Sequence, residues 1–137
     1  MPAPFHLLVI DDQASDLLLI QDTLDIDHPE VQLTLARDGR EALAACEFGR
    51  CPDLILLDFH LTGQSGLDVL RALKRQVVTR RIPVVMFSAS AAPADIDAAY
   101  AADAADYHVK PLLLTDLLVL LNRLIDTWSV RAALSRE

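Results

Sequence analysis

The chain has 137 residues, 53% of them hydrophobic, and a formal net charge of −8 at pH 7. This length and composition predict one folded domain and exclude a disordered chain. The acidic balance argues against nucleic-acid binding by the chain acting alone, and no apolar run reaches membrane-spanning length without a charge. The N-terminus has no basic region leading an apolar one, so we expect no signal peptide and a cytoplasmic location, with Cys46 and Cys51 as free thiols.

Short apolar segments alternate with longer segments of helical spacing along the chain. The predicted strands are residues 5–10, 31–36, 54–57, 82–87 and 107–109. The predicted helices are residues 15–27, 39–48, 65–76, 94–104 and 114–132. Five strand-helix repeats predict an α/β fold, a doubly wound five-stranded parallel sheet in the order 2-1-3-4-5. No linker or low-complexity stretch interrupts the pattern, so we expect residues 1–137 to form a single domain.

The third predicted strand is the most informative segment. It runs through four large apolar residues and ends in the carboxylate of Asp58. An apolar run without alternation is typical of a central parallel strand that is buried on both faces. In open α/β sheets the carboxyl ends of the strands form the ligand-binding edge, so Asp58 is expected there.

The other strands bring polar residues to the same edge. The first ends in Asp11 and Asp12, the fourth in Ser88 and the fifth in Lys110. Three carboxylates that lie close together repel one another, and Mg²⁺, which prefers oxygen ligands, relieves that repulsion. A lysine and a hydroxyl can then hold a phosphoryl group, which leaves Asp58 as the nucleophile. Each residue alone also has an ordinary explanation. Asp12 or Ser15 can cap a helix, for example, and Ser88 can belong to a turn.

Five motifs together resemble the receiver domain of two-component response regulators. They are Leu8-Val9-Ile10-Asp11-Asp12, residues 53–58, Ser65-Gly66-Leu67, residues 82–89 and Asp106-Tyr107-His108-Val109-Lys110-Pro111. Their order and spacing agree with the family over essentially the whole chain up to about Leu124. The resemblance implies the flavodoxin-like (βα)5 receiver fold.

The resemblance also implies a role for each residue of the site. Asp58 is expected to be the phospho-acceptor. Asp12 and Asp58 would bind Mg²⁺ directly together with the backbone carbonyl of His60, and Asp11 would act partly through water. Lys110 would pair with the phosphoryl group.

A second set of implied roles concerns the switch and the tuning of the site. Ser88 would donate to the phosphoryl group, and Tyr107 would turn inward as Ser88 moves. His60 and Ser90 occupy positions that tune how fast the phosphoryl group is lost. The resemblance further implies a cis peptide between Lys110 and Pro111. Thr62 departs from the family, which often has proline there, so a looser loop is expected.

The last predicted helix is unusually rich in leucine. One face is expected to serve the core; it comprises Leu114, Leu117, Leu118, Leu121, Leu124, Ile125 and Trp128. Leu113 and Leu120 widen this stripe, and Val119 and Val130 lie nearly opposite it. Scattered exposed apolar residues are ordinary, and the alternative is a homodimer interface. The extended end, about residues 125–137, is similar to that of small receivers that partner phytochrome-type histidine kinases, which also implies a homodimer.

These features predict a single-domain response regulator that accepts a phosphoryl group from a sensor histidine kinase or phosphotransfer protein. It would signal through the face formed by the fourth helix, fifth strand and fifth helix, as a switch and not a metabolic enzyme. A phosphate sink without output stays open. An aspartate-nucleophile phosphatase is disfavoured, because such enzymes need a second acid where this chain has His60. A flavin carrier would need a hydroxyl-rich loop where this chain has Asp11 and Asp12.

Overall fold

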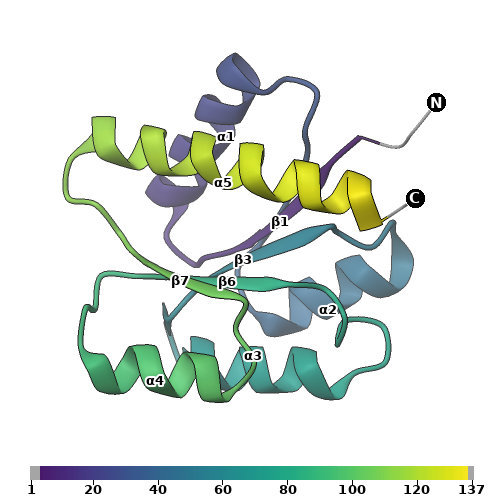
Figure 1. Ribbon diagram of the computed structural model, residues 1–137. Coiled ribbons are helices and arrows are strands. Elements are labelled where there is room, and N and C mark those ends of the chain that lie inside the picture. The colour runs from purple at the N-terminus through teal and green to yellow at the C-terminus, as the bar shows by residue number, and fades with distance from the viewer. Residues whose placement is uncertain (1–3, 136–137) are drawn as a thin grey trace.

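The computed structural model describes residues 4–135 and contains one five-stranded parallel sheet (Figure 1). Its strands are β1 (His6–Ile10), β2 (Gln32–Ala36), β3 (Leu54–Asp58), β6 (Val84–Ser88) and β7 (Asp106–Val109). They lie in the order β2-β1-β3-β6-β7, with every neighbouring pair parallel. The predicted fold and strand order, 2-1-3-4-5 when these five strands are numbered along the chain, are confirmed.

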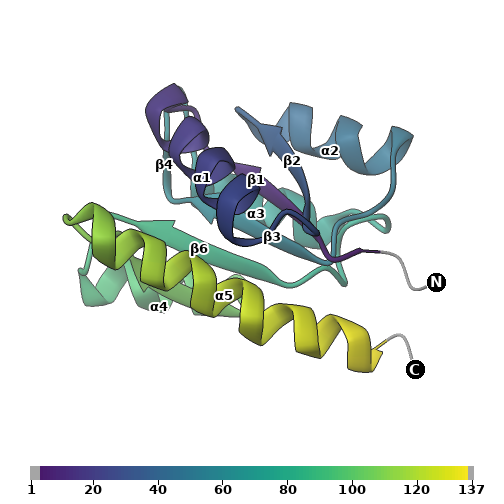
Figure 2. The same cartoon turned by 90° about the horizontal axis from the view of Figure 1, so that it is seen from above.

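Helices cover both faces of this sheet. They are α1 (Ala14–Asp27), α2 (Gly39–Phe48), α3 (Gly66–Arg75), α4 (Pro93–Ala101) and α5 (Leu114–Ser135). The helices α1 and α5 lie side by side over one face, and α2, α3 and α4 cover the other (Figures 1 and 2). No helix within residues 4–135 combines the length and hydrophobicity that a bilayer-spanning segment needs.

The central strand β3 supplies both halves of the core. Leu54 and Leu56 point to the side of α1 and α5, whereas Ile55 and Leu57 point to the side of α2, α3 and α4. All five residues of β3 are buried. Burial of one leucine or isoleucine side chain contributes about 1.5–3 kcal/mol, so β3 holds the two layers together and fixes where Asp58 emerges.

Local side-chain hydrogen bonds determine where two helices begin. The Asp38 carboxylate accepts from the backbone N–H of Glu41 at the start of α2, and the Ser65 hydroxyl accepts from that of Leu67 at the start of α3. Helix α1 differs from the sequence expectation. Its N-cap is Gln13, whose side chain makes no capping bond, so the capping role considered for Asp12 or Ser15 was wrong.

A short antiparallel hairpin follows β3 and was not expected from the sequence. It consists of β4 (His60–Leu61) and β5 (Gln64–Ser65), joined by a turn in which Gly63 has a φ of 74°. Strands of two residues are too short for an alternating pattern to reveal them. The hairpin brings the loop after Asp58 back to the start of α3.

Helix α5 buries a narrower stripe than its leucines suggested. Leu121, Leu124, Ile125 and Trp128 are buried, but Leu114 is 53% exposed, so its assignment to the core was wrong. Leu114 is the first residue of the helix, and the sheet-facing contacts of α5 with the core lie further along it. Several large apolar side chains of this region therefore face solvent, namely Leu112, Leu113, Leu114, Val119, Val130 and Leu134.

Candidate functional site

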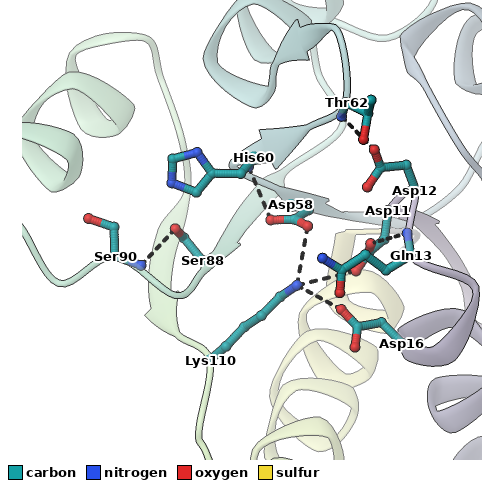
Figure 3. A network of polar contacts seen from close by, with 10 residues as sticks. All are labelled: Asp11, Asp12, Gln13, Asp16, Asp58, His60, Thr62, Ser88, Ser90 and Lys110. Atoms are coloured by element: carbon teal, nitrogen blue, oxygen red, sulfur yellow. Dashed lines mark hydrogen bonds and ion pairs between the residues drawn. The ribbon is translucent and has the colours of Figure 1, made fainter.

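Parallel strand ends bring the polar residues predicted from the sequence to one edge of the sheet (Figure 3). Asp11 follows β1, Asp58 ends β3, and Lys110 follows β7. Backbone hydrogen bonds hold two of these positions: Asp11 N–H donates to the Ala36 carbonyl at 3.0 Å, and Lys110 N–H donates to the Ser88 carbonyl at 2.7 Å. The sheet itself therefore determines the spacing of the site.

The Lys110 ammonium group contacts three carboxylates. Its Nζ lies 3.0 Å from Asp16 Oδ2, 3.2 Å from Asp58 Oδ2 and 3.3 Å from Asp11 Oδ2. Burial lowers the pKa of Lys110, but Asp16, Asp11 and Asp58 together outweigh it, so the pKa lies above its usual value. The ammonium group is thus a fixed positive charge beside Asp58.

Three of the carboxylates can share a cation. Ligand oxygens of Asp11, Asp12 and Asp58 all lie within 4.8 Å of one another. Asp11 and Asp58 are buried and Asp12 is partly exposed. Hard divalent cations prefer such oxygen donors, so the residues present fit a metal ion of the Mg²⁺ type.

Asp11 is the carboxylate most affected by its surroundings. Burial, together with the charges of Asp58 and Asp16, raises the pKa of Asp11 to about 6, although the Gln13 N–H and Lys110 favour its ionised form. The Gln13 N–H donates to Asp11 Oδ1 at 2.9 Å. Without a bound cation, an ionised Asp11 at neutral pH therefore destabilises the folded state.

This penalty predicts a stabilising substitution. The pKa of the Asp11 carboxyl is about 6 in the folded chain, well above the ordinary aspartate value of 3.8. Because the folded chain binds this proton more tightly than the unfolded chain, protonation of Asp11 stabilises the fold. This stabilisation is complete below pH 3.8 and is lost as the pH rises through 6. Asp11→Asn should therefore raise the free energy of unfolding at pH 7.5 by on the order of 2 kcal/mol, with a smaller gain at about pH 4.5. Urea denaturation in EDTA measures the free energy of unfolding at both pH values.

Asp12→Asn is the control, and it should lower the free energy of unfolding at pH 7.5, because hydrogen bonds from Thr62 lower the pKa of Asp12. An equal effect of Asp11→Asn at both pH values would contradict this account.

Thr62 has a direct function in this loop. Its backbone N–H donates to Asp12 Oδ2 from the turn between β4 and β5 (Figure 3). Proline, which has no N–H, could not make this bond. The residue that departs from the family pattern thus fixes one of the three carboxylates.

Ser88, Ser90 and Tyr107 form a second, connected group. The Ser88 hydroxyl is fully buried and accepts from the Ser90 N–H at 3.0 Å, and the Tyr107 hydroxyl donates to the Ser90 carbonyl at 2.8 Å. The Ser90 hydroxyl donates to Asp95 in the first turn of α4. Tyr107 is buried and packs with its ring against Phe59. The structure therefore joins the end of β6 to both β7 and α4.

Two further expectations concern His60 and the peptide bond between Lys110 and Pro111. His60 is exposed, and its backbone N–H donates to Asp58 Oδ1 at 3.1 Å, while the metal-binding role of its carbonyl stays a prediction. The cis peptide expected between Lys110 and Pro111 was wrong, since residues 4–135 contain no cis peptide bond. The trans form is favoured by about 0.5–1 kcal/mol before proline. With a trans peptide bond, Lys110 contacts the carboxylates of Asp11, Asp16 and Asp58.

The contact of Asp16 with Lys110 was not predicted from the sequence. Asp16 is the third residue of α1 and makes the shortest of the three contacts to Lys110. The available signal was its position one helical turn after Asp12, which places it near the same edge of the sheet.

A comparison with known families identifies this arrangement. The family model of the response regulator receiver domain matches residues 7–122. The chain belongs to this family. Receiver domains act as phosphorylation switches in two-component signalling.

Individual relatives show what kind of receiver the chain resembles. It is 30% identical to the response regulator Rcp1 of Synechocystis sp. over 131 residues, which cover 91% of this chain and 89% of Rcp1. It is 32% identical over 107 residues to the cyclic di-GMP phosphodiesterase response regulator RpfG of Xanthomonas campestris pv. campestris, and spans only 28% of that protein.

Solved structures agree with the sequence comparison. The Mn²⁺-bound form of Rcp1 superposes with a TM-score of 0.81 at 30% identity, covering 91% of this chain and 94% of Rcp1. The phosphorylated cyanobacterial phytochrome response regulator RcpA gives a TM-score of 0.83 at 30% identity, covering 92% and 94%. Receivers of the phytochrome type are thus among the structures this chain resembles.

Proposed function

We propose that this chain is a single-domain response regulator that accepts a phosphoryl group on Asp58 from a phosphohistidine. The contact that supports this most directly is the 3.2 Å between Lys110 Nζ and Asp58 Oδ2, inside a cluster of three carboxylates. A buried carboxylate with an ammonium group beside it suits an anionic, phosphorylated substrate.

Asp11, Asp12 and Asp58 would hold Mg²⁺ in this proposal. Bound there, the cation would neutralise charge on the transferred phosphoryl group. The chain's own residues do the rest. An Asp58 oxygen forms the bond to phosphorus while the bond from phosphorus to the donor's imidazole nitrogen breaks, and the released nitrogen keeps the electron pair. Lys110 pairs with the phosphoryl oxygens, and Ser88 donates its hydroxyl hydrogen to one of them.

The signal would leave through the face formed by α4, β7 and α5. Ser88 lies at the site, and the Ser90 backbone connects it to the Tyr107 hydroxyl on β7 and to α4. If the Ser88 hydroxyl turns to a phosphoryl group, its bond with the Ser90 N–H must rearrange. Tyr107 is then the side chain that registers the change, and His60 and Ser90, beside the site, would tune phosphoryl loss.

A phytochrome-type histidine kinase is the proposed partner, and the cytoplasm the proposed location. Support comes from the similarity to the phytochrome response regulator RcpA over 92% of this chain. A homodimer through the C-terminal helix region is also proposed, because Leu113 just before α5 and Val119 and Val130 within it are 64%, 49% and 59% exposed. Sedimentation velocity tests it: a monomer both with and without Mg²⁺ and beryllofluoride would contradict the dimer.

Phosphoryl transfer from a labelled histidine kinase tests the proposed function. Label should move rapidly to this chain in Mg²⁺ and should stay on the kinase in EDTA, because three unscreened carboxylates repel the phosphoryl donor. Transfer at an equal rate in EDTA would contradict the proposed metal dependence. No transfer from any phytochrome-type kinase, together with transfer from another kinase, would contradict only the proposed partner.

A further inference from the structure

Asp16 stands apart from the other carboxylates that touch Lys110. Its Oδ2 is the oxygen closest to Lys110 Nζ, at 3.0 Å, and its side chain is 29% exposed, against 2% for Asp11 and 5% for Asp58. It comes from the first turn of α1 and approaches the ammonium group from the side of that helix (Figure 3). The Lys110 ammonium group therefore lies between two buried carboxylates, Asp11 and Asp58, and one partly exposed carboxylate, Asp16.

Asp16 does not belong to the group that can hold a cation. Within residues 4–135 that group consists of Asp11, Asp12 and Asp58. Asp16 is also not the nucleophile in the proposed function. The ion pair that the structure gives Asp16 is with Lys110, so its direct contact with the site is made through the lysine.

The hydrogen-bonding capacity of Lys110 is limited. An ammonium group has three N–H donors, and each can serve one of the three carboxylates in contact with it. A phosphoryl group that approaches Asp58 needs at least one of these donors. When Asp58 becomes an acyl phosphate, its carboxylate charge is replaced by the charge of the phosphoryl oxygens, whereas the Asp16 carboxylate is chemically unchanged. Asp16 is thus a permanent competitor for the positive charge of Lys110.

We propose that Asp16 is a positioning residue that restrains the Lys110 ammonium group and competes with the incoming phosphoryl group for it. This inference rests on the proposed function, which assigns the phosphoryl group to Asp58. Asp16 would set how strongly the site attracts an anionic donor, and so act as a brake on phosphorylation. It adds a fourth carboxylate, beside Asp11, Asp12 and Asp58, to a site that has one ammonium group.

A purely structural role for Asp16 makes a different prediction. An acidic residue in the first turn stabilises any helix, and Asp68 in α3 has the same type of position. Asp68 is 66% exposed and pairs with Arg71. Asp68→Asn is therefore a matched control, because it removes one negative charge from a first turn without touching Lys110.

The test compares Asp16→Asn with Asp68→Asn, using acetyl phosphate as the donor at saturating Mg²⁺. The second-order rate constant of phosphorylation should rise about two- to fivefold in Asp16→Asn, the size that a partly exposed ion pair supports. The gain should shrink at high salt, Asp68→Asn should match the wild type, and Asp16→Glu should restore the wild-type rate. An unchanged or lower rate constant in Asp16→Asn would overturn the proposal.

A second measurement does not need phosphorylation. Without Asp16, Lys110 should settle on Asp11 and Asp58, where it competes with a cation. Calorimetric titration should then show Mn²⁺ binding weakened about two- to fivefold in Asp16→Asn and not in Asp68→Asn. If the wild type accepts no phosphoryl group, the proposed function fails, but this titration still tests whether Asp16 restrains Lys110. Equal Mn²⁺ affinity in both variants would contradict that restraint.

Discussion

Asp58→Asn should abolish phosphoryl uptake from a labelled histidine kinase. The amide oxygen is a far poorer nucleophile than a carboxylate, and an amide also removes one of the charges that would hold the cation. The asparagine side chain matches aspartate in size and should fit the buried position, where His60 N–H donates to Oδ1. We therefore expect a folded protein whose label falls by at least about a thousandfold, the range seen when a catalytic nucleophile is removed.

The control for this substitution is Asp68→Asn, which makes the same chemical change on the exposed surface of α3. It should take up label like the wild type. Circular dichroism and thermal melting of both variants establish that they are folded. Undiminished label on folded Asp58→Asn would show that another residue accepts the phosphoryl group.

Gly66→Ala should cause the largest loss of stability among the glycine substitutions. A Cβ atom at Gly66 would lie 2.2 Å from the Asp58 carbonyl oxygen, and 2.7 and 2.8 Å from the Cα and carbonyl oxygen of Phe59. These are backbone atoms, and the Gly66 N–H itself donates to the Phe59 carbonyl at 2.8 Å. Relief of the clash must move the start of α3 away from Asp58, so we expect a loss of about 3 kcal/mol or more in the free energy of unfolding.

Gly63→Ala is the matched control for Gly66→Ala. Gly63 has a φ of 74°, and no atom lies within 4 Å of a Cβ placed there. This substitution should cost only the backbone strain, about 1–2 kcal/mol. Urea denaturation measures both variants. If Gly66→Ala were no more destabilised than Gly63→Ala, the close approach of α3 to Asp58 would not be tight in solution.

The arrangement of the sheet could be predicted from the sequence because parallel strands leave a strong pattern. Asp58 ends an uninterrupted apolar strand, and Asp11 and Lys110 follow two others. Once the strand order is known, the carboxyl ends must meet, so the proximity of these residues follows from topology. The start of α2 at Gly39 was also predicted from the sequence, and the structure has the helix beginning there.

The side-chain partners could not be predicted in the same way. Asp16 contacts Lys110 across 94 residues of sequence, and no local pattern identifies that pairing. The bond from the Thr62 N–H to Asp12 depends on a hairpin whose strands have only two residues each. The exposure of Leu114 depends on where α5 meets the sheet, which helical spacing alone does not determine.

The most direct test of the central proposal is to locate the phosphoryl group. Protein phosphorylated by a histidine kinase is reduced with borohydride, which converts an aspartyl phosphate into homoserine, and the digested peptides are sequenced by mass spectrometry. The proposed function predicts homoserine at position 58 and unchanged aspartates at positions 11, 12 and 16. Homoserine at another aspartate, or none in protein that carries the label, would contradict it.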